Sequence, residues 1–214
     1  MPLPFAVLIS GRGSNMLALA RATRDGRIDG EIVRVVCDRP GAAGLAAATS
    51  LGLATAVVPP IAGEDRAAYG ERLAAVLRES GARLVALAGF MRILGSGFVR
   101  NWTGRLLNIH PSLLPAYRGL HTHRRALAAG ERAHGCTVHF VIEELDAGPP
   151  VIQGRLATWP GEDESGLSAR VQRLEHIIYP RAVGWFAAGR LALRDGAALL
   201  DGRATLPEVV EEET

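Results

Sequence analysis

Hydrophobic and polar positions alternate between two patterns along the first hundred residues. Short runs of aliphatic and β-branched residues predict buried strands at 5–9, 32–36, 55–58 and 84–88. Longer segments lie between them, and their apolar residues recur every three or four positions, as on one face of a helix. This alternation predicts strand–helix–strand crossovers and an α/β fold with a doubly wound, mostly parallel sheet that is Rossmann-like in this half.

Glycines mark the expected ends of the two clearest helices. The segment 64–80 is followed by Gly81, and the segment 14–25 is followed by Gly26. Glycine favours the left-handed conformation in which many helices end. Ser14 is expected to cap the N-terminus of the earlier helix with its hydroxyl group.

The second half of the chain is less regular. Strands are predicted at 105–110, 137–141 and 151–158, and a loop rich in proline and glycine follows the first of them, at 111–120. We expect residues 1–104 to form a nucleotide- and phosphate-binding half. Residues 105–214 are expected to form a second half that shares one continuous sheet and one domain with it.

A long helix and a hairpin are predicted to complete the second half. The helix is expected at 163–188, with Pro180 kinking or interrupting it. The hairpin is expected at 191–201 and should turn at the Asp195–Gly196 pair.

The composition excludes several kinds of chemistry. All 24 basic side chains are arginines, so no lysine is present for a Schiff base or a P-loop. With 22 acidic side chains the net charge is +2, which is too balanced for a general nucleic-acid binder. The acidic run Glu208–Glu213 is expected to be a frayed, solvated end.

The cysteines and the apolar runs favour a cytoplasmic protein. Cys37 and Cys136 each lie in an apolar run and are predicted to be buried free thiols. The N-terminal residues lack a basic segment, and no apolar stretch is long enough to cross a bilayer. We therefore expect a chain that binds neither membrane nor nucleic acid, either as a monomer or as a homodimer.

Three polar segments are candidates for chemistry. The segment Ser10–Asn15 follows a strand and opens a helix, so its glycines form either a phosphate site at the helix N-terminus or a simple tight turn. Asn108 and His110 lie two apart on a predicted strand and point to one face, near the edge where open α/β sheets bind ligands. Asp146 precedes Gly-Pro in a turn-like segment, and would orient His110 and raise its pKa if the two meet.

The remaining histidines favour structural roles. His121 and His123 are spaced as metal ligands could be, but no carboxylate or cysteine cluster completes a metal site, so helix capping or substrate contact is favoured. His134, His139 and His176 are interpreted as structural. No metal is expected.

Five segments of the chain resemble the folate-dependent formyltransferases, and within them the enzymes that act on glycinamide ribonucleotide (GAR). They are Ser10–Asn15, Ala88–Leu94, Asn108–Pro115, Gly119–His123 and Glu144–Pro149. The resemblance spans about Phe5 to Leu200. It implies a transferase of purine biosynthesis and one-carbon metabolism that moves a formyl group from 10-formyltetrahydrofolate, as cosubstrate, to the amine of GAR.

The resemblance also implies that residues 105–214 are the catalytic and folate-binding half, and it implies a role for each matching residue. The catalytic set would be Asn108, His110 and Asp146. GAR would be bound by Gly13, Ser14, Asn15, Gln172 and Glu175. The folate would be bound by Arg66, Met91, Arg92, Ile93, Leu94, Asn108, Ile142, Glu143, Glu144, Leu145 and Asp146.

Three alternatives stay open at this point. A related enzyme acting on methionyl-tRNA or a sugar nucleotide would usually carry an extra C-terminal domain, and the acidic tail disfavours tRNA. A formyltetrahydrofolate hydrolase would usually carry an N-terminal regulatory domain. A binding protein without turnover is disfavoured by the intact Asn108, His110 and Asp146.

Overall fold

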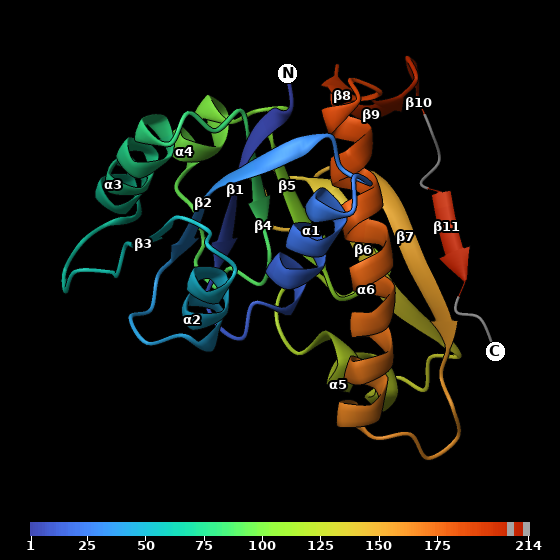
Figure 1. Cartoon of the computed structure of the whole chain (residues 1–214). Helices are drawn as coiled ribbons and strands as arrows, with labels where there is room; N and C mark the ends of the chain where they lie inside the picture. The colour runs from blue at the N-terminus through green and yellow to red at the C-terminus, as the bar shows by residue number, and fades with distance from the viewer. Residues whose placement is uncertain (205–207, 212–214) are drawn as a thin grey trace.

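An eight-stranded sheet runs through the protein (Figure 1), seen here in a computed structural model that describes residues 1–204 and 208–211. Its strand order is β11-β7-β6-β5-β4-β1-β2-β3. The strands are β1 (Leu3–Ile9), β2 (Gly30–Cys37), β3 (Thr55–Val57), β4 (Leu84–Leu87), β5 (Leu106–His110), β6 (Ala133–Phe140), β7 (Pro150–Ala157) and β11 (Glu208–Glu211). The five neighbouring strands β3, β2, β1, β4 and β5 are parallel, whereas β5, β6 and β7 pair antiparallel. The predicted α/β class with a mostly parallel sheet is confirmed.

Helices cover both faces of this sheet (Figure 1). They are α1 (Ser14–Arg24), α2 (Ala43–Ser50), α3 (Arg66–Glu79), α4 (Ser96–Asn101), α5 (Thr122–Ala128) and α6 (Glu164–Ala187). Side chains of α1 and α6 pack into the larger core, and those of α3 and α4 pack into a second core on the opposite face. Burial on both faces explains the continuous apolar runs of the central strands.

The long helix α6 begins and ends within one residue of its predicted limits. The carboxylate of Asp163 accepts a hydrogen bond from the backbone N–H of Gly166 at 2.7 Å and so caps the helix. Of the kink or interruption expected at Pro180, the interruption is wrong, because α6 continues through this residue to Ala187. Its buried face holds it in place: the Tyr179 hydroxyl donates to the backbone carbonyls of Leu87 and Leu107, at 3.0 and 3.2 Å.

A small second sheet follows α6. It contains β8 (Leu191–Arg194), β9 (Ala197–Leu200) and β10 (Arg203–Ala204), all antiparallel. Asp195 and Gly196 both have positive φ, at 48° and 75°, as a two-residue hairpin turn of type I′ requires. The predicted hairpin is confirmed.

Two local predictions are wrong. Ser14 does not cap α1, because it is the first helical residue and the preceding Gly13 adopts a left-handed conformation with no side-chain cap. The acidic tail is a strand over Glu208–Glu211, parallel to β7, with Glu211 3.2 Å from the guanidinium of Arg155. This strand pairs with backbone groups that β7 would otherwise expose at the sheet edge. Residues 212 and 213 lie outside the described residues.

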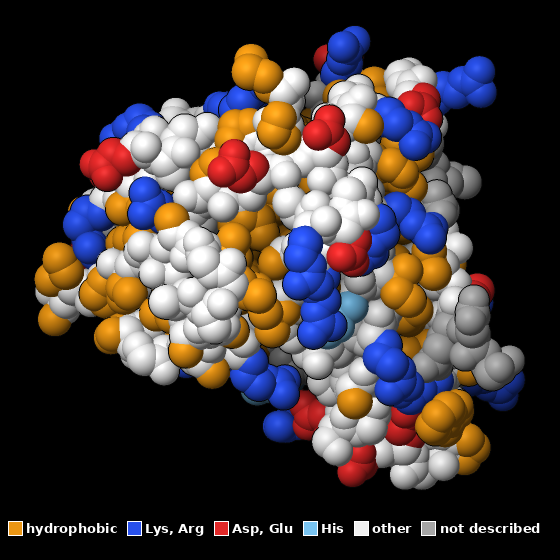
Figure 2. All heavy atoms as spheres, viewed as in Figure 1, with side chains coloured by type: hydrophobic (Ala, Val, Ile, Leu, Met, Phe, Trp, Pro, Cys, Tyr) orange, Lys and Arg blue, Asp and Glu red, His pale blue; other side chains and the backbone are white. Residues whose placement is uncertain are grey.

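Charged side chains are dispersed over the face that carries α1 and α6 (Figure 2). Arginines lie among acidic and apolar groups there and do not form a continuous basic stripe. In the described part of the chain, no helix is both long enough and apolar enough to cross a membrane.

Candidate functional site

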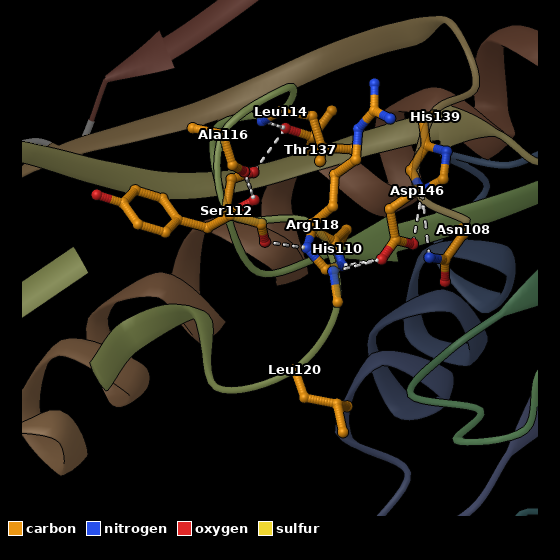
Figure 3. Close-up of polar contacts among 12 residues, drawn as sticks. Asn108, His110, Ser112, Leu114, Ala116, Arg118, Leu120, Thr137, His139 and Asp146 are labelled. Atoms are coloured by element: carbon orange, nitrogen blue, oxygen red, sulfur yellow. Dashed lines mark hydrogen bonds and ion pairs between the residues drawn. The ribbon is translucent and has the colours of Figure 1, made fainter. Parts of the chain in front are cut away.

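Four polar side chains meet beside the paired strands β5 and β6 (Figure 3). His110 is the last residue of β5, and Asn108 lies two residues before it on the same strand. His139 lies on β6 directly opposite Asn108, because the two strands pair antiparallel in that register. Asp146 comes from the loop that follows β6. The sheet and this loop thus bring together the three predicted catalytic residues, and His139 lies beside them as a fourth polar side chain.

His110 has an acceptor beside each ring nitrogen. Its Nδ1 lies 3.4 Å from Oδ2 of Asp146, and its Nε2 lies 3.0 Å from the backbone carbonyl oxygen of Tyr117. Both His110 and Asp146 are largely buried. Since a carbonyl and a carboxylate only accept hydrogen bonds, this arrangement suits a ring that carries a proton on both nitrogens.

His139 holds the amide of Asn108. Nδ1 of His139 lies 2.9 Å from the carbonyl oxygen of Phe140, which accepts a hydrogen bond and so requires a proton on Nδ1. Burial lowers the pKa of His139 to about 4, so the ring is neutral near pH 7 and its Nε2 carries a lone pair. That lone pair accepts from Nδ2 of Asn108 at 3.2 Å. The second N–H of the Asn108 amide is left for another acceptor.

Asp146 both forms a turn and faces His110, which are the two roles that its sequence allows. Its φ of 49° places it in the left-handed region that turn-forming aspartates tolerate. The same turn aims the Asp146 carboxylate at His110. This carboxylate also accepts a hydrogen bond from the backbone N–H of Gly119 at 3.0 Å. The turn is therefore what positions the carboxylate.

Two surface loops are joined above this cluster. The guanidinium of Arg118 contacts the carboxylate of Glu144 at 2.6 Å, and Arg125 donates to the carbonyls of Arg118 and Leu120 at 2.7 and 3.3 Å. These contacts hold the segment after β5 against the loop that carries Asp146. The placement of the loop side chains beside the cluster therefore depends on the positions of both loops.

A cavity of about 230 Å³ lies next to the cluster, and residues from both halves of the chain line it. Its lining contains all five residues predicted to bind GAR, which are Gly13, Ser14, Asn15, Gln172 and Glu175. Ile109 and Pro111, which flank His110, line it too. A larger groove of about 840 Å³ lies between α1 and the first half of β2, at the amino ends of the parallel strands.

Glu175 and Asn15 form a buried pair in this cavity. Nδ2 of Asn15 donates to Oε2 of Glu175 at 2.8 Å, and burial raises the pKa of the Glu175 carboxyl to about 6. Oδ1 of Asn15 is buried without a hydrogen-bond partner. A buried acceptor that lacks a donor costs free energy, so a ligand hydroxyl or amine would stabilise it.

The residues predicted to bind folate lie on four segments, one of which is β5 with Asn108. Arg66 begins α3, and its backbone packs against Gly95. In the loop after β4, Met91 and Ile93 are exposed, Leu94 packs on the smaller core, and the guanidinium of Arg92 stacks 4.7 Å from the Tyr69 ring. In the loop after β6, Leu145 is exposed, and the side chain of Glu143 contacts Arg100 at 3.1 Å. Of the residues predicted to bind folate, Met91 alone is also in the lining of the cavity.

The other histidines differ in their surroundings: Nε2 of His176 is buried without a hydrogen-bond partner among the described residues, and burial lowers the pKa of this ring. His121 precedes α5 in a left-handed conformation, and Nδ1 of His123 lies 3.1 Å from Nε2 of His134. Burial lowers the pKa of both His123 and His134, the latter to about 4. Within residues 1–204 and 208–211, no three His, Cys, Asp or Glu side chains are grouped as metal ligands would be.

Residues 3–183 match the formyl transferase family model, and the chain belongs to that family. It is 46% identical to the phosphoribosylglycinamide formyltransferase of Escherichia coli over 202 residues, which cover 94% of this chain and 95% of that protein. The structure of a phosphoribosylglycinamide formyltransferase from Coxiella burnetii superimposes with a TM-score of 0.93 at 43% identity, covering 98% of this chain and 100% of that one. A formyltetrahydrofolate deformylase from Burkholderia mallei shares the fold at 27% identity, with a TM-score of 0.85 over 94% of this chain and 70% of that one.

Proposed function

We propose that this chain is a phosphoribosylglycinamide formyltransferase. It transfers the formyl group of 10-formyltetrahydrofolate to the primary amine of GAR and yields formyl-GAR and tetrahydrofolate in de novo purine biosynthesis. The observation that carries the proposal is the end-to-end similarity to the Escherichia coli enzyme. The reaction is assigned to the cytoplasm, where free buried thiols such as Cys37 and Cys136 stay reduced.

GAR is assigned to the cavity beside the catalytic cluster. The phosphate group is assigned to the N-terminus of α1, where Gly13, Ser14 and Asn15 line the cavity and the free backbone N–H groups of the first helical turn carry a partial positive charge. Gln172 and Glu175 on α6 are assigned to the remainder of GAR. This arrangement directs the substrate amine towards His110.

The formyl-folate is assigned to the exposed side of the cluster. Met91 and Ile93 expose apolar side chains there, and Leu145 does so from the loop after β6. Exposed apolar groups in two neighbouring loops suit the faces of an aromatic ligand. In this proposal residues 1–104 supply the phosphate site and residues 105–214 supply the catalytic groups, as two halves of one domain.

The catalytic step is proposed to use Asn108, His110 and Asp146 together. The GAR amine attacks the formyl carbon, the bond from that carbon to N10 breaks, and one amine proton moves to N10. Asn108 donates its second amide N–H to the developing oxyanion, and the protonated His110 donates a charged hydrogen bond. The formyl oxygen takes the place of the Tyr117 carbonyl at Nε2 of His110.

Asp146 is assigned two tasks in this step. Its carboxylate faces Nδ1 of His110 and stabilises the positive charge of the ring. It also orders the water molecule that carries the proton from the attacking amine to N10. No step requires a metal ion, so turnover is expected to persist in EDTA; loss in EDTA that a divalent ion restores would contradict this.

A formyltetrahydrofolate hydrolase is the competing function, because the Burkholderia mallei deformylase has the same fold. A spectrophotometric assay of folate deformylation, run with and without GAR, separates the two. Turnover that depends on GAR is expected. Turnover at the same rate without GAR would identify a hydrolase, and binding without turnover would identify a protein that only binds folate.

A further inference from the structure

The cavity offers the GAR phosphate less positive charge than that group requires. Ser14, Asn15 and Met16 begin α1, and their backbone N–H groups have no partner within the helix because Leu17 is the first residue to bond back, to Gly13. A helix N-terminus supplies about half an elementary charge. A phosphate monoester carries about −1.5 to −2 near pH 7. Most of its charge is therefore left without a counterpart.

Other ionisable groups in the lining do not make up the difference. Glu175 is acidic, and although burial raises the pKa of its carboxyl to about 6, the group adds no positive charge in either protonation state. His123 also lines the cavity, but burial lowers its pKa, which keeps the ring neutral. The charge of the ligand must be met by a side chain that stays cationic.

Arg12 is the arginine of the cavity lining. It lies between Gly11 and Gly13 in the loop that leads into α1, and its side chain is exposed. It forms no hydrogen bond or ion pair with any other residue in the described part of the chain. A guanidinium stays charged at all working pH values, and its planar fork matches two phosphate oxygens.

We propose that Arg12 is a substrate-binding residue that pairs with the phosphate group of GAR. This inference rests on the proposed function. Because its side chain has no partner of its own, Arg12 is free to swing over the helix N-terminus and close the outer side of the phosphate.

The test compares Arg12→Gln and Arg12→Lys with the matched control Arg83→Gln. Arg83 is also exposed and lies just before β4, at the amino ends of the parallel strands, whereas Arg12 follows the carboxyl end of β1. Arg12→Gln should raise KM for GAR about tenfold, as expected for the loss of one charged hydrogen-bond pair at a partly exposed site. Its kcat and its KM for formyl-folate should change less than twofold. Arg12→Lys should recover most of the loss, and Arg83→Gln should behave as the unaltered enzyme.

A second measurement isolates the phosphate group. Ribose 5-phosphate, used as a competitive inhibitor against GAR, should have its inhibition constant raised by the same factor in Arg12→Gln. An unchanged KM for GAR in a variant that still shows GAR-dependent turnover overturns the role of Arg12 and leaves the proposed function intact. Equal increases in KM for GAR and for formyl-folate overturn it too, because they indicate a disturbed loop. If the unaltered chain shows no turnover that depends on GAR, the proposed function itself fails.

Discussion

At the scale of single residues, Asp146 is the carboxylate on which the catalytic proposal depends. Replacing it by asparagine keeps the size of the side chain but removes the charge that faces His110. We expect Asp146→Asn to lower kcat by about 10²–10³, the usual effect of losing one group that stabilises a transition state, with KM for GAR nearly unchanged. Steady-state kinetics with both substrates checks this, and Asp29→Asn, at an exposed position before β2, serves as control. Near-normal turnover of Asp146→Asn would contradict the assigned role.

His139 should act by positioning Asn108. In His139→Phe the Asn108 amide loses the acceptor at 3.2 Å that fixes its orientation, so kcat should fall about tenfold while KM for GAR stays constant. His139→Gln, which again offers an acceptor, should restore part of the rate. Because burial lowers the pKa of His139 to about 4, the acid limb of the pH–rate profile above pH 5 should not move in either variant. A folded His139→Phe enzyme with normal kcat would show that Asn108 needs no such partner.

The sequence identified some of these residues and missed others for a physical reason. Alternation along one strand was enough to place Asn108 and His110 on one face. His139 was interpreted as structural, because its contact with Asn108 depends on the antiparallel register of β5 against β6, which no local pattern encodes. The only local sign was a histidine in an otherwise apolar strand. Likewise, the meeting of His110 with Asp146 was stated as a possibility and became visible only in three dimensions.

At the scale of elements, the start of α1 links the fold to the substrate site. Gly13 has a φ of 76°, and a Cβ there would lie 3.0 Å from the Cα of Gly44 on α2. Gly13→Ala should therefore reduce the free energy of unfolding by about 1–2 kcal/mol and raise KM for GAR. The matched control is Gly97→Ala in α4, where a Cβ meets nothing within 4 Å and alanine should stabilise the helix by about 0.5–1 kcal/mol. Urea titrations of both variants check the opposite signs.

Long elements were predicted more accurately than short ones. The helix α6 begins and ends within one residue of its predicted limits, because 24 residues contain many turns of apolar periodicity and an aspartate cap. The helices α4 and α5 have seven residues or fewer and were not predicted, since two turns give little periodicity, and α2, with eight residues, was expected only as a helical segment without bounds between two strands. The strand β11 was missed because its stability comes from pairing with β7 and not from its own acidic sequence.

At the scale of the whole molecule, buried titratable groups set how stability depends on pH. Burial lowers the pKa values of His134 and His139 to about 4, from an ordinary value of 6.5. Between these values the unfolded chain binds more protons than the folded one, so acid favours unfolding. Glu175 acts in the opposite sense, because burial raises its pKa from 4.5 to about 6 and the folded chain binds its proton more readily. The effect of the two histidines on stability opposes that of the one carboxyl group, and the pKa values of the histidines are shifted further.

We therefore expect the free energy of unfolding to fall as the pH is lowered from 6.5 to 4.5, by on the order of 3 kcal/mol. Urea titrations at several pH values within this range measure it. His134→Asn should flatten the dependence, because the unfolded chain then has one proton fewer to gain. His121→Asn should leave the slope unchanged, since His121 is exposed and asparagine tolerates its left-handed φ of 58°. A free energy of unfolding that rises towards pH 4.5 would mean that Glu175, and not the buried histidines, dominates the proton balance of folding.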